Sequence, residues 1–407
     1  MKPNILIESL ILTVTLFMTG CRKSDILTAD GTPIKVNVST VNTKSVAMTT
    51  NGILVAGHFV LDAFVTDEYK LYDEEGHETS TQPGGQYISS NGNYNVFYSA
   101  SSYPDTDRDE SDVTEGWYIK DASGYETYDW IKDNLTRFWC RWPAAGELDS
   151  DDEGRCVVTL PDKDSEIMNF TYQMPVPVST KPYTDATRQK DILFAYAEKK
   201  YDGGSNLIDI KFNHPLSKVC FCVSPDDGSF DTNLIIKDIS ISGVPNGGSC
   251  GFHGKGQITN GGSNPMFVWS GQSGSSTFRQ TYNVSFSGNG VPAGWDDNNR
   301  YKSQSDSKDY NVYYAEDDTK KEHPLKKYTC ENAFMMIPHT LSGASLKVTF
   351  GNTGTGSDIP VSVDLPEDTW YPGYYYCYKI SAATIGRTIK VGISLAEWDN
   401  YDDKLFF

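Results

Sequence analysis

The sequence predicts an all-β protein built from two antiparallel β-sandwich domains. Short segments along the chain alternate apolar and polar residues with a period of two, which is the pattern of strands that bury one face. The chain holds 25 Tyr, 18 Phe and 8 Trp beside 35 Gly. Aromatic residues suit a pleated surface and Gly suits the turns between short strands. With 407 residues, the chain has the length of two domains rather than of one ordinary sandwich.

The N-terminal half contains several short predicted strands. In the first of them, Ile34, Val36 and Val38 share one face and polar residues occupy the other. Residues 67–93 are acidic and Gly-rich, which is typical of hairpin loops, and residues 129–138 are compatible with one short helix. The other strands predicted in this half lie at residues 53–55, 59–61, 94–98, 157–160, 170–174 and 192–197.

A Gly pair at residues 203–204 marks the predicted domain boundary. It separates an N-terminal β-sandwich domain of residues 33–203 from a C-terminal one of residues 204–407. The last predicted strand carries Ile389, Val391, Ile393 and Leu395 at alternating positions. The other strands predicted in the C-terminal half lie at residues 207–212, 219–223, 234–241, 346–350, 361–365 and 374–380.

The N-terminus has the features of a lipoprotein signal peptide over residues 1–20. Lys2 precedes an apolar run that is too short and too polar to span a bilayer permanently. Small residues then lead directly into Cys21, whose thiol is the expected lipidation site. An ordinary signal peptide with a chance Cys is the alternative. Residues 21–32 are polar and predict a tether, and acyl chains on Cys21 would hold the protein to the outer membrane.

The formal net charge of −19 excludes nucleic acid as an expected partner. Nucleic acid carries dense negative charge, so a strongly acidic protein is expected not to bind it. The same charge keeps an exported protein soluble.

No constellation of residues in the sequence predicts catalysis, a metal site or a cofactor. His214 and Ser217 lie near each other, but no nucleophile elbow surrounds the serine, and a structural histidine is the better interpretation. The acidic run from residue 149 begins like a calcium loop but has Leu160 where a bidentate carboxylate is required. We therefore expect a protein that is not an enzyme, with no catalytic residue, no metal and no cofactor.

The cysteines beyond the signal peptide leave two alternatives open. Cys140 and Cys156 are candidates for a disulfide across a hairpin, with buried free thiols as the alternative. Cys220 and Cys222 point to the same face of one predicted strand, where zinc binding would need two further ligands that the sequence does not supply. Buried structural thiols are the favoured interpretation for this pair.

Several segments in order along the chain resemble one known family. The segments are Phe138 to Pro143, Asp191 to Ala195, Ile210 to Val219, Phe334 to Leu341 and Trp370 to Tyr378. They resemble the fimbrillin-like family, the type V pilins of Gram-negative anaerobes. The resemblance implies an exported lipoprotein with two transthyretin-like sandwiches. It also implies assembly into fimbriae by β-strand exchange after a protease removes the first strand.

The resemblance further implies a maturation cut after a basic residue near the first strand. No Arg lies between Arg22 and Arg108, so Lys35 and Lys44 are the candidates. Lys44 is preferred, because a cut there frees the whole first strand. The strand that carries Ile389 could then fill the vacated groove of a neighbouring pilin subunit. The alternative is that residues 34–38 stay in place as a permanent strand of a monomer.

The function expected from the sequence is that of a fimbrial subunit or surface adhesin lipoprotein of the cell outer membrane. Its partners would be other pilin subunits, the outer membrane, and a host or bacterial surface glycan or protein. The alternative is a cell-surface glycan-binding lipoprotein that does not polymerise, because Trp and Tyr rings stack on sugars. A hydrolase is the least favoured interpretation.

Overall fold

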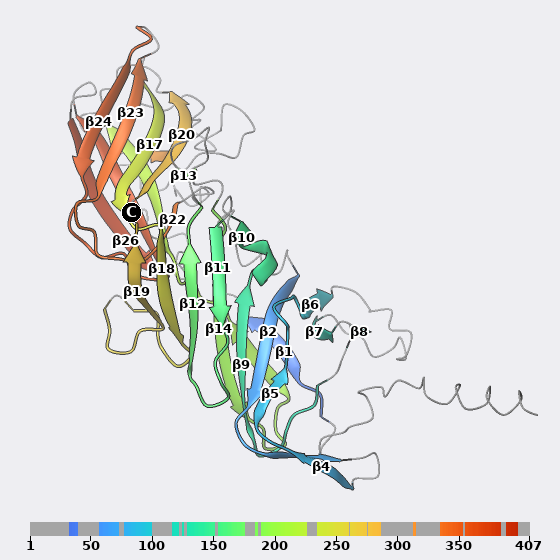
Figure 1. Ribbon diagram of the computed structural model, residues 1–407. Coiled ribbons are helices and arrows are strands. Elements are labelled where there is room, and N and C mark those ends of the chain that lie inside the picture. The colour runs from blue at the N-terminus through green and yellow to red at the C-terminus, as the bar shows by residue number, and fades with distance from the viewer. Residues whose placement is uncertain are drawn as a thin grey trace, which may run out of the picture.

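The computed structural model confirms the all-β prediction. It describes residues 32–39, 57–72, 77–99, 116–121, 124–125, 128–150, 154–175, 184–185, 189–225, 234–259, 261–274, 276–285, 312–314, 334–352, 355–383 and 388–397. Within these ranges the chain forms strands and one short 3-10 helix, η2 (Ala145–Glu147). The molecule is elongated, with β2 and β9 toward one end and β23 and β24 toward the other (Figure 1). The transthyretin-like type of sandwich stays a prediction.

The largest sheet contains the N-terminal strands. Its order is β14-β9-β2-β6-β7-β1-β15, with β5 paired to β2 and β8 paired to β7. These strands are β14 (Leu193–Lys200), β9 (Leu135–Trp142), β2 (His58–Val65), β6 (Val96–Ser99), β7 (Gly116–Asp121), β1 (Lys35–Ser39), β15 (Leu207–Lys211), β5 (Gly85–Ile88) and β8 (Gly124–Tyr125).

A second sheet lies in the middle of the molecule (Figure 1). Its order is β10-β11-β12-β18-β19, and every neighbouring pair is antiparallel. The strands are β10 (Asp149–Ser150), β11 (Gly154–Thr159), β12 (Ile167–Gln173), β18 (Gly247–His253) and β19 (Phe267–Ser273).

Two further five-stranded sheets contain most of the C-terminal half. One has the order β13-β20-β17-β23-β24, with β13 (Thr184–Asp185), β20 (Ser276–Ser285), β17 (Leu234–Val244), β23 (Ser345–Asn352) and β24 (Asp358–Asp364). The other has the order β21-β16-β25-β26 with β22 paired to β16, and consists of β21 (Val312–Tyr314), β16 (Ser217–Pro225), β25 (Tyr374–Ala383), β26 (Thr388–Glu397) and β22 (Phe334–Met336).

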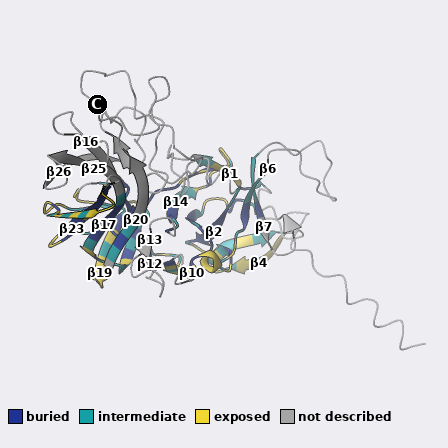
Figure 2. Ribbon diagram, turned by 90° about the horizontal axis from the view of Figure 1, so that it is seen from above, coloured by how far each residue is buried: buried dark blue, intermediate teal, exposed yellow. Residues whose placement is uncertain are grey.

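Most of β9 and the first three residues of β14 are buried on both faces, because they separate two hydrophobic cores. Phe138 and Cys140 belong to the core of the N-terminal sheet, whereas Trp139 between them belongs to the larger core that extends to the C-terminal sheets. Leu193 and Phe194 divide between the two cores in the same way. Successive side chains of a strand point to opposite faces, so one strand can serve both cores. Figure 2 shows the buried strands in dark blue, whereas the hairpin strand β4 is exposed or intermediate.

Two local predictions are wrong. Residues 129–138 form no helix: Asp133 has a positive φ of 62°, which an α-helix does not tolerate, and β9 starts at Leu135. Residues 67–93 are not loops throughout, because β3 (Tyr69–Tyr72) and β4 (Glu78–Gln82) pair as a hairpin and β5 joins β2. Neither hairpin strand has a buried residue, so the polar composition of β4 does not prevent strand formation.

Strand pairing connects the chain on both sides of the predicted boundary at residues 203–204. β15, which follows the Gly pair, contributes Ile208 and Ile210 to the N-terminal core, and β18 pairs with β12. Separate folding of residues 33–203 and 204–407 stays a prediction. The strand predicted at residues 53–55 lies outside the described residues.

Candidate assembly site

The first strand, β1, lies between two other strands of the N-terminal sheet. It pairs in parallel with β15 over five positions, from Lys35 opposite Leu207 to Ser39 opposite Lys211. On its other side a single antiparallel bridge joins Val36 to Trp117 of β7. β1 is therefore an internal strand that fills a slot between β7 and β15.

The side chains of β1 alternate as the sequence predicts. Ile34 and Val36 are 9% and 6% exposed, and both belong to the N-terminal core. Lys35 and Asn37 are exposed on the opposite face, where the Asn37 amide donates a hydrogen bond of 2.7 Å to an Asp209 carboxylate oxygen. One face of β1 thus closes a hydrophobic core, while the other remains accessible to water.

Backbone hydrogen bonds hold the start of β1 in the slot. The Ile34 amide donates to the Tyr128 carbonyl at 2.7 Å and the Lys35 amide to the Asn206 carbonyl at 2.9 Å. In return, the Trp130 amide donates to the Thr32 carbonyl at 2.8 Å. If β1 left, these groups and the buried face beneath the strand would be uncovered together, which is unfavourable unless another strand replaces it.

The predicted processing residues lie outside the described part of the chain, with one exception. Cys21 and Lys44 are both outside it, as is the signal peptide of residues 1–20. Lys35 lies on β1 itself with an exposed side chain. Because Lys44 stands between β1 and β2 in the sequence, a cut there would leave β1 attached by non-covalent contacts alone. Lipidation and cleavage at these positions stay predictions.

The last predicted strand forms as β26, which confirms that element. It pairs antiparallel with β25 over ten positions, from Thr388 opposite Ala383 to Glu397 opposite Tyr374. In the order of its sheet β26 is the terminal strand. An edge strand is bonded along one side only, so it can leave its sheet without separating two neighbouring strands.

The structure brings Asp191 and His214 together but gives them no nucleophile. The Nδ1 atom of His214 lies 2.7 Å from a carboxylate oxygen of Asp191, and the two side chains are 3% and 0% exposed. Ser217 is fully buried, and its hydroxyl donates to the Tyr371 carbonyl at 2.9 Å. A buried hydroxyl that is bonded to the backbone cannot reach a substrate, so this group ties the start of β16 to the turn before β25.

The cysteine hypotheses have different outcomes. Cys140 and Cys156 are free thiols, so the proposed cross-hairpin disulfide is wrong. They lie on β9 and β11, which belong to different sheets and do not form a hairpin. Burial raises the pKa of the Cys156 thiol to about 12 and raises that of Cys140 well above its usual value. The side chains of Cys220 and Cys222 lie outside the described part of the structure.

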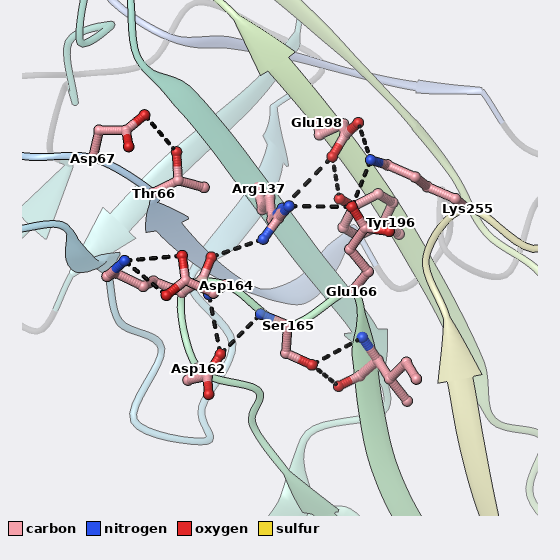
Figure 3. Close-up of polar contacts among 12 residues, drawn as sticks. Thr66, Asp67, Arg137, Asp162, Asp164, Ser165, Glu166, Tyr196, Glu198 and Lys255 are labelled. Atoms are coloured by element: carbon pink, nitrogen blue, oxygen red, sulfur yellow. Dashed lines mark hydrogen bonds and ion pairs between the residues drawn. The ribbon is translucent and has the colours of Figure 1, made fainter.

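A charged cluster around Arg137 is a structural network (Figure 3). The guanidinium of Arg137 lies 3.2 Å from Glu166 and 3.6 Å from Glu198, and the Lys255 ammonium contacts the same two carboxylates at 2.6 and 2.9 Å. The Tyr196 hydroxyl donates to Glu198. Burial acts to raise the pKa of Glu198, but hydrogen bonds from Tyr196 and Lys255 outweigh it and lower that pKa.

This network joins different layers of the molecule. Arg137 lies on β9 and Glu198 on β14, whereas Lys255 follows β18 of the middle sheet. Each charge faces an opposite charge, so the cluster connects the N-terminal and middle sheets and holds no free nucleophile. Among the described residues, no group of three or more His, Cys, Asp or Glu side chains could hold a metal ion. No helix within the described ranges is long and apolar enough to cross a bilayer.

A family model provides the assignment that the fold alone does not. The model described as fimbrillin-like matches residues 160–398. The chain therefore belongs to the fimbrillin-like family, which confirms the resemblance seen in the sequence. No curated protein matches the chain.

Solved structures of fimbrial proteins are similar to the chain at low identity. A fimbrial protein from Bacteroides vulgatus is 14% identical, with a TM-score of 0.45, and the match covers 90% of this chain and 99% of that one. A fimbrial assembly protein from Parabacteroides distasonis is 9% identical, with a TM-score of 0.35, and the match covers 89% of this chain and 99% of the other. The family assignment rests on the family model.

Proposed function

We propose that the protein is a fimbrial subunit that assembles by β-strand exchange at the slot of β1. The observation that carries this proposal is the position of β1 between β7 and β15, with a buried apolar face. All the other described strands follow β1 in the sequence, so the segment that contains Lys44 is its covalent link to them. One cut there would turn an internal strand into a bound peptide that another strand can replace.

The energetics favour replacement over an empty slot. Burying a Val or Ile side chain is worth about 1.5–3 kcal/mol, so the loss of Ile34 and Val36 together removes several kcal/mol from the N-terminal core. The open edges of β7 and β15 would also need new backbone partners. A strand from a neighbouring subunit restores both the apolar burial and the backbone hydrogen bonds. Strand addition supplies backbone bonds together with side chains at alternate positions.

The proposed donor is the last strand of a neighbouring subunit. β26 has apolar residues at Ile389, Val391, Ile393 and Leu395, with the two-residue spacing that Ile34 and Val36 use in the slot. It lies at the edge of its own sheet. A donor at one place and an acceptor at another give a head-to-tail contact, which builds an open filament rather than a closed pair.

The assembly test uses a chain that begins at Ser45 and therefore lacks β1. We expect this chain to form ladders that resist SDS, and a second chain that also lacks residues 388–407 to remain monomeric. A chain that keeps residues 32–44 is the control and is expected to stay monomeric. If the Ser45 chain stays monomeric at high concentration, or the ladders survive deletion of residues 388–407, the exchange model is wrong.

We also propose that the subunit is exported to the outer membrane through acyl chains on Cys21. Several chains together hold the uncut chain firmly to the membrane, since each buried methylene contributes about 0.8 kcal/mol. A cut at Lys44 separates Cys21 from the subunit, so this anchor acts before that cut. Labelling of cells with a palmitate analogue should mark the wild-type protein and should fail with Cys21→Ala. Label that persists in the variant would refute the anchor.

The role that we propose is structural and adhesive rather than catalytic. The His214–Asp191 pair is buried, and the hydroxyl of the nearby Ser217 is bonded to the backbone. Membership of a fimbrial family agrees with this role.

A further inference from the structure

A cleft of about 600 Å³ lies beside β19, where the middle sheet meets the segment just before β25. This volume is within the range of small-ligand sites, which is roughly 300–1,000 Å³. One wall comes from β19 and the connection between β18 and β19, and the other from the segments at residues 338–340 and 369–372. The cleft is far along the chain from the slot of β1 and shares no residue with it.

Backbone hydrogen bonds build the second wall of the cleft. The Trp370 amide donates to the His339 carbonyl at 2.9 Å, the Leu341 amide donates to the Asp368 carbonyl at 2.7 Å, and Thr340 bridges to Thr369. On the first wall, the indole nitrogen of Trp269 donates to the Pro215 carbonyl at 2.8 Å. The Trp269 indole is therefore held in place before any ligand arrives.

The chemical character of the lining narrows the class of ligand. None of the lining residues is an Asp, Glu, Lys or Arg, although the protein as a whole is strongly acidic. Trp269 and Tyr371 provide partly exposed aromatic rings, and Gln257 and Gln272 provide amides. A lining of aromatic faces and neutral polar groups fits a neutral ligand that has both an apolar face and hydrogen-bonding groups.

His339 indicates which hydrogen-bonding group the ligand should carry. Its Nδ1 lies 2.7 Å from the Ile337 carbonyl oxygen, which can only accept, so Nδ1 carries the proton. Burial lowers the pKa of this imidazole, so the ring is neutral and Nε2 is an acceptor. Nε2 is buried without a partner among the described residues. A buried acceptor without a donor is unfavourable, and a ligand hydroxyl would satisfy it.

We propose that this cleft binds a neutral saccharide, which stacks on Trp269 or Tyr371 and donates a hydroxyl hydrogen bond to Nε2 of His339. A sugar ring combines C–H faces with several hydroxyl donors, which is the pairing that the lining offers. This binding site is independent of strand exchange, so the protein would recognise a glycan whether or not it polymerises.

The test measures binding of neutral hexasaccharides of glucose, mannose, xylose and N-acetylglucosamine to the full chain, by Trp fluorescence and calorimetry. At least one should bind. His339→Phe keeps a flat ring but removes the acceptor, and it should weaken that binding about tenfold, the effect of one hydrogen bond. Trp269→Ala should weaken it at least as much. His58→Phe, a change of the same kind on β2, should leave affinity unchanged.

Three outcomes would overturn the proposal. The first is that none of the neutral oligosaccharides binds at millimolar concentration. The second is that one binds with the same affinity to wild type and to folded His339→Phe, with folding checked by thermal melting. The third is that a peptide of residues 388–407 displaces the sugar, which would make the cleft a strand-docking site. If Trp269→Ala does not fold, His339→Phe decides the question alone.

Discussion

Val36→Ala should weaken the binding of β1 in its slot, and the burial of Val36 gives the size of the expected loss in binding free energy. Val36 is 6% exposed, so the change removes two almost fully buried methyl groups. At about 0.8 kcal/mol for each carbon, the loss is ~1.6 kcal/mol, or roughly a fifteenfold weaker hold on the strand. The cavity left behind would add to this loss.

The assay uses a chain in which a site for a specific protease replaces residues 41–47 and a fluorophore marks the N-terminus. After cleavage, dilution releases the β1 peptide, and fluorescence anisotropy gives its dissociation constant. Lys35→Gln is the matched control, because Lys35 lies next to Val36 but points to solvent. Val36→Ala should release the peptide at about fifteenfold higher protein concentration, and Lys35→Gln should behave as the unsubstituted chain. Equal release from the two variants would refute the reasoning.

Three further predictions concern the rest of the molecule. Arg137→Met should lower the free energy of unfolding by about 1.5–3 kcal/mol, whereas Arg155→Met, in an exposed pair, should cost about 0–1 kcal/mol; denaturant titration compares them. Cys140 and Cys250 are buried with raised pKa values, so alkylation at pH 8 followed by peptide mapping should find them unmodified until denaturant is added. The lowered pKa of Glu198 means that its stabilising contribution is present above about pH 4.5 and is lost below it, so Glu198→Gln should flatten the fall in Tm as the pH drops through that range.

Much of the strand content could be predicted from alternation in the sequence. The first and last strands illustrate this, since Val36 and the residues from Ile389 to Leu395 fall where β1 and β26 form. Period two is a local property of the chain, and it identifies a half-buried strand without knowledge of its neighbours. Alternation does not say which strand lies next to which, so the slot between β7 and β15 could not be predicted.

Local sequence patterns predict the wrong secondary structure where a strand is buried on both faces, where it is exposed on both faces, or where a turn interrupts it. Residues 129–138 mix apolar and polar residues because they cover a turn at Asp133 and then the start of β9, and so short a segment is compatible with either a helix or a strand. The hairpin of β3 and β4 has no buried residue, so β4 forms a strand without an apolar face. The Asp191–His214 pair and the cleft at His339 join residues that are distant in sequence, so no spacing could predict them.

The central claim is that the last strand of one subunit fits the slot that β1 leaves in another. The most direct measurement is the binding of a peptide of residues 388–407 to a chain of residues 45–387, with a peptide of residues 32–44 as the positive control. Strand exchange predicts that both peptides bind this chain, that the two compete, and that Val391→Asp abolishes binding of the first. It also predicts no binding to the chain of residues 32–407, in which β1 fills the slot and β26 stays paired with β25. Binding of the 388–407 peptide that the 32–44 peptide does not displace, which would be rebinding to the vacated edge of β25, or no binding while the control peptide binds, would contradict strand exchange at this slot.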